Sequence, residues 1–187
     1  NLVKKAVELR MPAVAVTDHG NLFSVIDFYQ KALKAGVKPI IGCEIYVAPG
    51  SRFEKSSLSL QSDEEYSNYH LILLARNKQG YRNLVKLVTY AFLEGFYRKP
   101  RIDKELLRQH HEGLIGLSAC LGGEVPALLM QNRSDEAKRA ALEYRSILGE
   151  ENFYLELQDN GIPEQEHPAH ARVDRHEVDV AVVVEVA

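Results

Sequence analysis

The chain of 187 residues contains no tryptophan and only two cysteines, Cys43 and Cys120. Two cysteines in a chain of this length do not form the disulfide framework that stabilises small secreted domains. We therefore expect reduced thiols and a cytoplasmic protein. Because free cysteine is usually buried, Cys43 is expected to lie in the core.

Long apolar runs are also missing from the sequence. The longest apolar stretches are far shorter than the roughly 20 residues that a membrane span requires. The first residues lack the apolar segment of a signal peptide. The chain also has no phosphate-binding P-loop, no dinucleotide fingerprint and no nucleophile elbow. Membrane insertion and these common enzyme classes are therefore not predicted.

The sequence has no excess of positive charge, since its formal net charge is −3. Proteins that hold nucleic acid through its backbone neutralise phosphates with lysine and arginine. A strongly basic nucleic-acid clamp is therefore excluded, and a role on DNA would need its main contacts elsewhere. With 45% hydrophobic and 26% charged residues, the chain has the composition of an ordinary globular domain.

Short apolar runs alternate with helical patterns along the chain. Strands are expected at residues 13–16, 37–47, 70–75, 113–117 and 153–157, and helices at residues 2–9, 21–35, 81–93, 104–110, 123–131 and 134–148. Asp103 and Ser134 are expected to cap the helices at 104–110 and 134–148. Residues 48–68 indicate a loop, and residues 98–101 a short basic turn. Sequential β/α units predict an α/β fold with a mainly parallel sheet, and periodicity leaves open whether it closes into a barrel.

The composition narrows abruptly after residue 166, to valine, alanine, histidine, aspartate, arginine and glutamate. Residues 178–186 are compatible with a strand. We predict instead that residues 167–187 form a non-native or disordered tail, for example after a frame error. An intact reading frame in the source DNA would contradict this prediction.

Polar residues of the metal-binding type lie at the ends of the expected strands. His70 begins its strand, whereas His19, with its neighbour Asp18, and Glu44 and Cys120 lie at or beyond the ends of theirs. Ligand sites of α/β folds gather at strand ends. Histidine, carboxylate and thiolate together suit zinc and related divalent metals. Each residue also has a purely structural alternative: His70 as a core or edge histidine, Glu44 as a solvated charge, Asp18 and His19 as turn residues, and Cys120 as an inert thiol. Because these residues are scattered along the sequence, their spacing alone is a weak sign of a metal site.

Long motifs give a more specific indication than the individual ligands. In order, residues 15–23, 38–48, 69–71, 94–103 and 117–126 resemble the PHP (polymerase and histidinol phosphatase) domain of the bacterial DNA polymerase III alpha subunit. The resemblance covers about residues 1–166. The Glu-Gly-Phe-Tyr-Arg-Lys-Pro-Arg block at residues 94–101 points to the polymerase branch of the family.

The resemblance implies a PHP-type distorted (β/α)7 barrel, similar to a TIM barrel, with a cleft that holds divalent zinc or manganese. The metal ligands that it implies are His19, Glu44, His70 and Cys120, and Asp18 is expected to orient His19. It also implies a His-x-His motif ahead of the first helix and an Asp-x-His motif beyond residue 166. We expect both motifs to be missing, so that the domain is incomplete at both ends and no residue is assigned a catalytic role.

The resemblance also implies a function for the parent enzyme. That enzyme is a DNA-directed DNA polymerase, a nucleotidyltransferase that uses magnesium in DNA replication and works with DNA, an exonuclease subunit and a sliding clamp. The PHP site implies descent from a metal-dependent 3′→5′ exonuclease or phosphoesterase, and the chain by itself is expected to be inactive. A stand-alone phosphoesterase of the histidinol-phosphatase type and a non-catalytic docking module stay open as alternatives.

Overall fold

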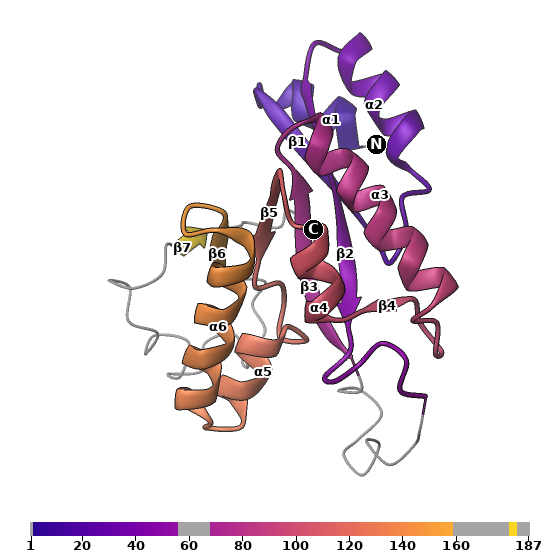
Figure 1. Ribbon diagram of the computed structural model, residues 1–187. Coiled ribbons are helices and arrows are strands. Elements are labelled where there is room, and N and C mark those ends of the chain that lie inside the picture. The colour runs from indigo at the N-terminus through magenta and orange to yellow at the C-terminus, as the bar shows by residue number, and fades with distance from the viewer. Residues whose placement is uncertain (1, 56–67, 159–179, 183–187) are drawn as a thin grey trace.

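The computed structural model describes residues 2–55, 68–158 and 180–182. Helices and strands alternate along most of the chain (Figure 1). In chain order the elements are α1 (Leu2–Glu8), β1 (Ala13–His19), α2 (Val25–Lys34), β2 (Lys38–Val47), β3 (Tyr69–Ala75), α3 (Lys78–Leu93), β4 (Arg101–Ile102), α4 (Lys104–Gln109), β5 (Leu114–Leu117), α5 (Glu124–Met130), α6 (Ser134–Leu148), β6 (Phe153–Leu157) and β7 (Val180–Val182).

The strands form one sheet in the order β1-β2-β3-β5-β6-β7, and β4 pairs with β2 beside this path. Four pairs are parallel, namely β1–β2, β2–β4, β5–β6 and β6–β7. Strand β3 runs antiparallel to both of its neighbours, β2 and β5. The predicted α/β class is therefore confirmed, but the sheet is mixed rather than parallel throughout.

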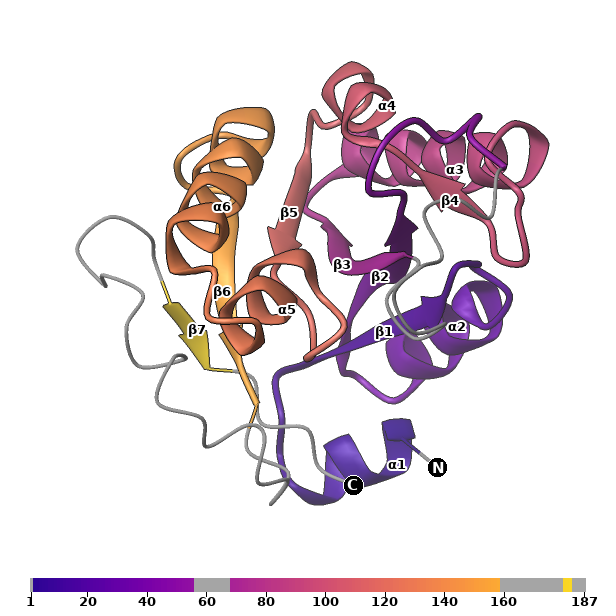
Figure 2. The ribbon, with the colours of Figure 1, turned by 90° about the horizontal axis from the view of Figure 1, so that it is seen from below.

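The sheet of the described residues is open, with β1 and β7 at its two ends. Its strands curve into an arc, and helices α2, α3, α4 and α6 lie outside that arc (Figure 2). A closed barrel requires the first and last strands to pair with each other. The described residues therefore do not form the closed (β/α)7 barrel that the resemblance implies.

The main hydrophobic core joins side chains of strands β2 to β6 to side chains of helices α3, α4, α5 and α6. Side chains alternate between the two faces of a strand, so Cys43, Ile45 and Val47 of β2 enter this core, with Cys43 fully buried as expected. Burying a side chain such as that of Ile45 stabilises the fold by about 1.5–3 kcal/mol. The same alternation leaves Glu44 and Tyr46 on the inner face of the arc.

The helix caps follow the sequence only in part. The carboxylate of Asp103 accepts a hydrogen bond of 2.9 Å from the backbone N–H of Leu106, which confirms the predicted cap of α4. The predicted cap at Ser134 is wrong, because Ser134 is the first residue of α6 and Arg133 occupies the N-cap position. The turn after α5, with Asn132 at a φ of 59°, leads directly into α6, whose bounds are those predicted from the sequence.

Two short strands differ from the sequence-based expectations. Arg101 and Ile102, at the end of the expected basic turn, form β4 and pair in parallel with Tyr46 and Val47 of β2. Two residues are too few to show a periodic pattern, so β4 depends on its partner strand. Strand β7 pairs in parallel with β6, which confirms the strand alternative for residues 180–182. The rest of the tail predicted at 167–187 lies outside the described residues.

Candidate metal centre

Glu44 lies at the middle of the candidate site. Its neighbours on β2 face the core, so its own side chain projects from the inner face of the sheet and is 13% exposed. Two histidines approach the same oxygen, Oε1, of this carboxylate. A partly buried carboxylate costs free energy unless it is paired, and these two rings supply the pairing.

His70 reaches Glu44 because β3 runs antiparallel to β2. The pairing places His70 directly opposite Tyr46, two residues from Glu44 on the same face. His70, the second residue of β3, therefore lies at the edge where the parallel strands β1 and β5 end. The Nδ1 atom of His70 lies 2.7 Å from Oε1 of Glu44.

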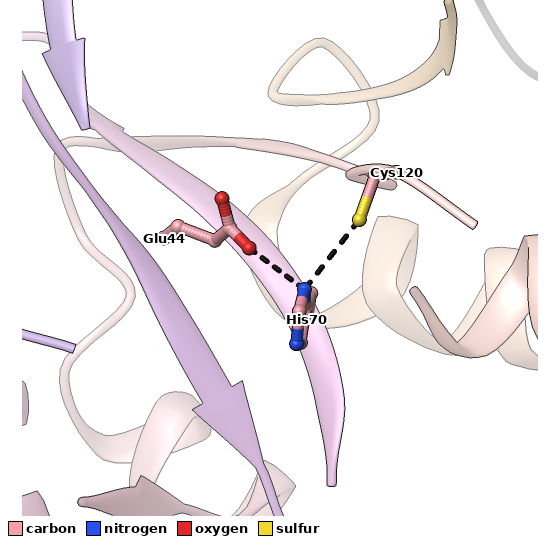
Figure 3. Close-up of side chains that lie close together, drawn as sticks. All are labelled: Glu44, His70 and Cys120. Carbon is pink, nitrogen blue, oxygen red and sulfur yellow. Dashed lines mark hydrogen bonds and ion pairs between the residues drawn. The ribbon is translucent and has the colours of Figure 1, made fainter. Parts of the chain in front are cut away.

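Cys120 comes from the loop between β5 and α5. Its Sγ atom lies 3.5 Å from Nδ1 of His70, and Figure 3 shows the dashed contacts of Glu44 and Cys120 converging on this nitrogen. The loop is fixed to β3, because the backbone N–H of His70 donates to the carbonyl oxygen of Gly122 over 2.9 Å. Glu44, His70 and Cys120 each offer a ligand atom, and these atoms all lie within 4.8 Å of one another.

Two glycines shape this loop. A Cβ atom on Gly123 would lie only 1.9 Å from the carbonyl oxygen of Ser118, so no side chain fits there without moving the backbone. A Cβ atom on Gly122 would lie 3.1 Å from Nδ1 of His70. These glycines were not predicted to shape the site, although a Gly-Gly pair two residues after Cys120 is a signal of close backbone approach.

His19 lies beside the group of three. It ends β1, and the parallel register pairs it with Glu44. Its Nδ1 atom lies 3.3 Å from Oε1 of Glu44, and its side chain is 67% exposed. The structure therefore brings all four sequence-predicted ligands to one edge of the sheet, with His19 on the solvent side.

Asp18 makes its hydrogen bonds elsewhere. Its carboxylate accepts from the backbone N–H and from the hydroxyl of Ser24, both over 2.8 Å. Because adjacent residues of a strand point to opposite faces, Asp18 faces away from Glu44. These bonds hold the turn that leads into α2, and the expected orienting role toward His19 stays a prediction.

The charges of the site depend on one another. Burial raises the pKa of Glu44, but the hydrogen bonds and charges of His70 and then of His19 together outweigh burial, and the pKa is lowered from its ordinary value. Hydrogen bonds to Cys120 and then to Glu44 raise the pKa of His70 from 6.5 to about 9, against the effect of burial. Without metal, His70 is therefore a cation at neutral pH, and a metal ion would replace its proton.

The donor set fits a divalent metal. A carboxylate, an imidazole and a sulfur are the usual protein ligands of zinc. Three ligands from three different segments leave room in the coordination sphere, as in zinc sites that bind a water or a substrate oxygen. The inner face of the sheet can therefore hold a divalent cation between Glu44, His70 and Cys120.

Comparisons with known proteins show the family to which the chain is similar. The PHP domain family model matches residues 1–160. The chain is 49% identical over 168 residues, 90% of its length, to the DNA polymerase III subunit alpha of Treponema pallidum. It is 49% identical over 166 residues, 89% of its length, to that of Borreliella burgdorferi, and 53% identical over 154 residues, 82% of its length, to that of Thermus aquaticus. The chain spans 12–14% of the length of these relatives.

The helices in the described part of the chain include no candidate membrane span. None of them combines the length and the apolar character that crossing a lipid bilayer requires.

Proposed function

This chain belongs to the PHP domain family and matches the PHP domain of DNA polymerase III alpha subunits, and we propose that it serves in such a replicative DNA polymerase. The proposed parent enzyme is a DNA-directed DNA polymerase that uses magnesium for nucleotide addition. Its proposed partners are DNA, an exonuclease subunit and a sliding clamp. Chromosomal DNA lies in the bacterial cytoplasm, so we place the parent enzyme there.

For the PHP domain itself we propose a divalent metal centre of zinc or manganese, held by Glu44, His70 and Cys120 with His19 beside them. The convergence of these ligand atoms within 4.8 Å of one another is the observation that supports this proposal. A metal ion bound there would supply an activated water and neutralise phosphate charge, the chemistry of phosphodiester hydrolysis.

The roles of the protein side chains follow from their positions. Glu44 and His70 would hold the metal from adjacent strands, and Cys120 from the loop that Gly122 fastens to β3. The exposed ring of His19 lies toward solvent, where a substrate would enter. We also propose that the arc of strands is part of a distorted (β/α)7 barrel, with this centre on its inner face.

We further propose that the chain alone is inactive as a 3′→5′ exonuclease, because the four candidate ligands are fewer than the ligand set that the resemblance implies for the metal cluster of the family. Incubation with a 3′-labelled primer and manganese or zinc is expected to leave the primer intact. Metal-dependent cleavage that His19→Ala abolishes would contradict this part of the proposal.

Metal binding tests the centre directly. Zinc affinity is measured by competition with a chromophoric chelator, on the wild-type chain and on Glu44→Gln, His70→Ala and Cys120→Ser. We expect weak but specific uptake by the wild-type chain and a loss of at least about tenfold in each variant. His111→Ala, at a histidine beyond α4, is the matched control. If all variants bind zinc like the wild type, the centre is not formed by these residues, and a non-catalytic docking role becomes the better explanation.

A further inference from the structure

A tight turn brings a lysine to the inner face of the sheet. Tyr97 and Lys99 exchange two backbone hydrogen bonds, of 3.1 Å and 2.7 Å, across Arg98. Arg98 adopts a left-handed conformation with a φ of 60°. The two reciprocal bonds fix the backbone of Lys99, and Pro100 restricts it further because a proline limits the backbone of the residue before it.

The turn is anchored to the strand that carries Glu44. Arg101, directly after the turn, pairs with Tyr46 of β2 and is 5% exposed. Its guanidinium donates to the carbonyl oxygens of Gly95 over 3.0 Å and of Glu54 over 2.8 Å. The turn therefore keeps its position relative to β2, and Lys99 with it.

The side chain of Lys99 lies over a ring that touches the metal centre. Its Nζ atom is 4.4 Å from the centre of the Tyr46 ring, a distance typical of cation–π contacts. The Tyr46 ring is buried and meets the ring of His70 edge-on, with 5.2 Å between the ring centres. One buried aromatic ring thus separates the ammonium group from a candidate ligand.

The turn also touches the other side of the centre. A Cβ atom on Gly20 would lie 2.9 Å from Cγ of Pro100 and 3.0 Å from Cε2 of Tyr46. Gly20 follows His19 at the end of β1. The turn at 97–99 and the end of β1 therefore pack together beside the centre, and Lys99 lies at its edge.

The other cations of this segment have partners. Arg101 is held by the backbone carbonyl groups described above, and Lys104 pairs with Glu124 and Glu143, each over 2.8 Å. Lys99 is exposed, and within residues 2–55, 68–158 and 180–182 no carboxylate forms an ion pair with it. Its ammonium donors are therefore available to an anion.

We propose that Lys99, held over Tyr46, forms a phosphate subsite beside the metal centre and binds a non-bridging oxygen of a phosphodiester or phosphomonoester. This inference rests on the proposed function, because it takes the substrate of the centre to be a phosphate ester. An ammonium group donates charge-assisted hydrogen bonds to phosphate oxygens. Lys99 is thus a positioning residue for the substrate and not a metal ligand.

Isothermal titration of the full chain with thymidine 5′-monophosphate tests the subsite, with zinc at a concentration that saturates the wild-type centre. Lys99→Met is expected to weaken binding about tenfold, the loss of one hydrogen bond to a charged group. Lys99→Arg keeps the charge and is expected to stay within about threefold of the wild type. Lys86→Met, which removes an exposed lysine of α3, is the matched control and is expected to bind like the wild type.

Zinc affinity and the thermal unfolding midpoint of each variant are measured in parallel, and both are expected to be unchanged by Lys99→Met. Equal binding of the nucleotide by Lys99→Met and Lys86→Met would overturn the subsite. Equal binding of thymidine, which lacks the phosphate, would also overturn it. If the wild-type chain takes up no zinc, the proposed metal centre fails. The same titration of the metal-free chain then decides whether a Lys99-dependent phosphate site exists without it.

Discussion

Raising the pH from 6.5 to 9.5 should destabilise the metal-free chain through one residue, His70. Hydrogen bonds to Cys120 and to Glu44 raise the pKa of His70 from 6.5 to about 9 in the folded state. In the unfolded chain these bonds are lost and the imidazole returns to its ordinary pKa of about 6.5. Between these two values the folded state holds a proton that the unfolded state releases.

The sign and size of the effect follow from this difference. The stabilisation is fully present below about pH 6.5, decreases as the pH rises, and is lost above about pH 9. Each tenfold change in proton affinity corresponds to about 1.4 kcal/mol, so the displaced pKa sets a ceiling of about 3 kcal/mol. The side chain of His70 is 23% exposed, and water screens part of the interaction. We expect a loss of about 1–2 kcal/mol.

Urea unfolding in the presence of a chelator measures this loss. The free energy of unfolding is compared at pH 6.5 and pH 9.5 for the wild-type chain and for His70→Gln, with His111→Gln as the control. Titrating groups away from the site, including the lysines and the exposed tyrosines, contribute equally to all three proteins. Between pH 6.5 and pH 9.5, the free energy of unfolding of His70→Gln should fall by about 1–2 kcal/mol less than that of the other two proteins. Equal losses in the wild type and in His70→Gln would refute the assignment of the raised pKa to this hydrogen-bonded cluster.

Three further predictions concern the same region. Zinc affinity should rise between pH 6.5 and pH 8.5, because zinc must displace the proton of His70. Competition with a chelator at a series of pH values measures the affinity. An affinity that does not change with pH would contradict the role of His70 as a ligand. Gly123→Ala should lower stability by about 1–3 kcal/mol, because its Cβ atom would lie 1.9 Å from a backbone oxygen. Thermal unfolding should show a much smaller effect for Gly50→Ala, where the nearest atom, 3.0 Å away, belongs to the flexible Glu54 side chain. Asp103→Ala should cost about 3 kcal/mol in chemical unfolding, because it removes a helix cap and leaves the buried Arg52 without the carboxylate to which its Nη1 atom donates. A loss below about 1 kcal/mol would show that Glu94 alone satisfies Arg52.

The positions of most elements could be predicted from the sequence because they depend on local patterns. The apolar run at 70–75 forms β3 within one residue, and the helix after Asp103 begins where its cap predicts. Short elements escaped prediction for the same reason. Strand β4 has two residues and no period of its own, and it exists because β2 offers it a paired edge.

The identities of the candidate ligands also came from the sequence, through residue chemistry and the family motifs. His19, Glu44, His70 and Cys120 are the residue types that zinc prefers, and each lies near the end of a strand. The roles of Tyr46 and Lys99 were not predicted. A lysine in a basic turn carries no local sign that its side chain lies over a particular ring 53 residues earlier in the chain.

What the sequence by itself determined was therefore the class of fold, the boundaries of its longer elements and the chemistry of the candidate ligands. Only the tertiary structure decided that β3 runs antiparallel, which turns the start of that strand toward the ends of its neighbours and places His70 against Glu44 and Cys120. The physical reason is that side-chain periodicity reports which face of a strand is buried. Strand direction depends on hydrogen bonds between segments far apart in the chain.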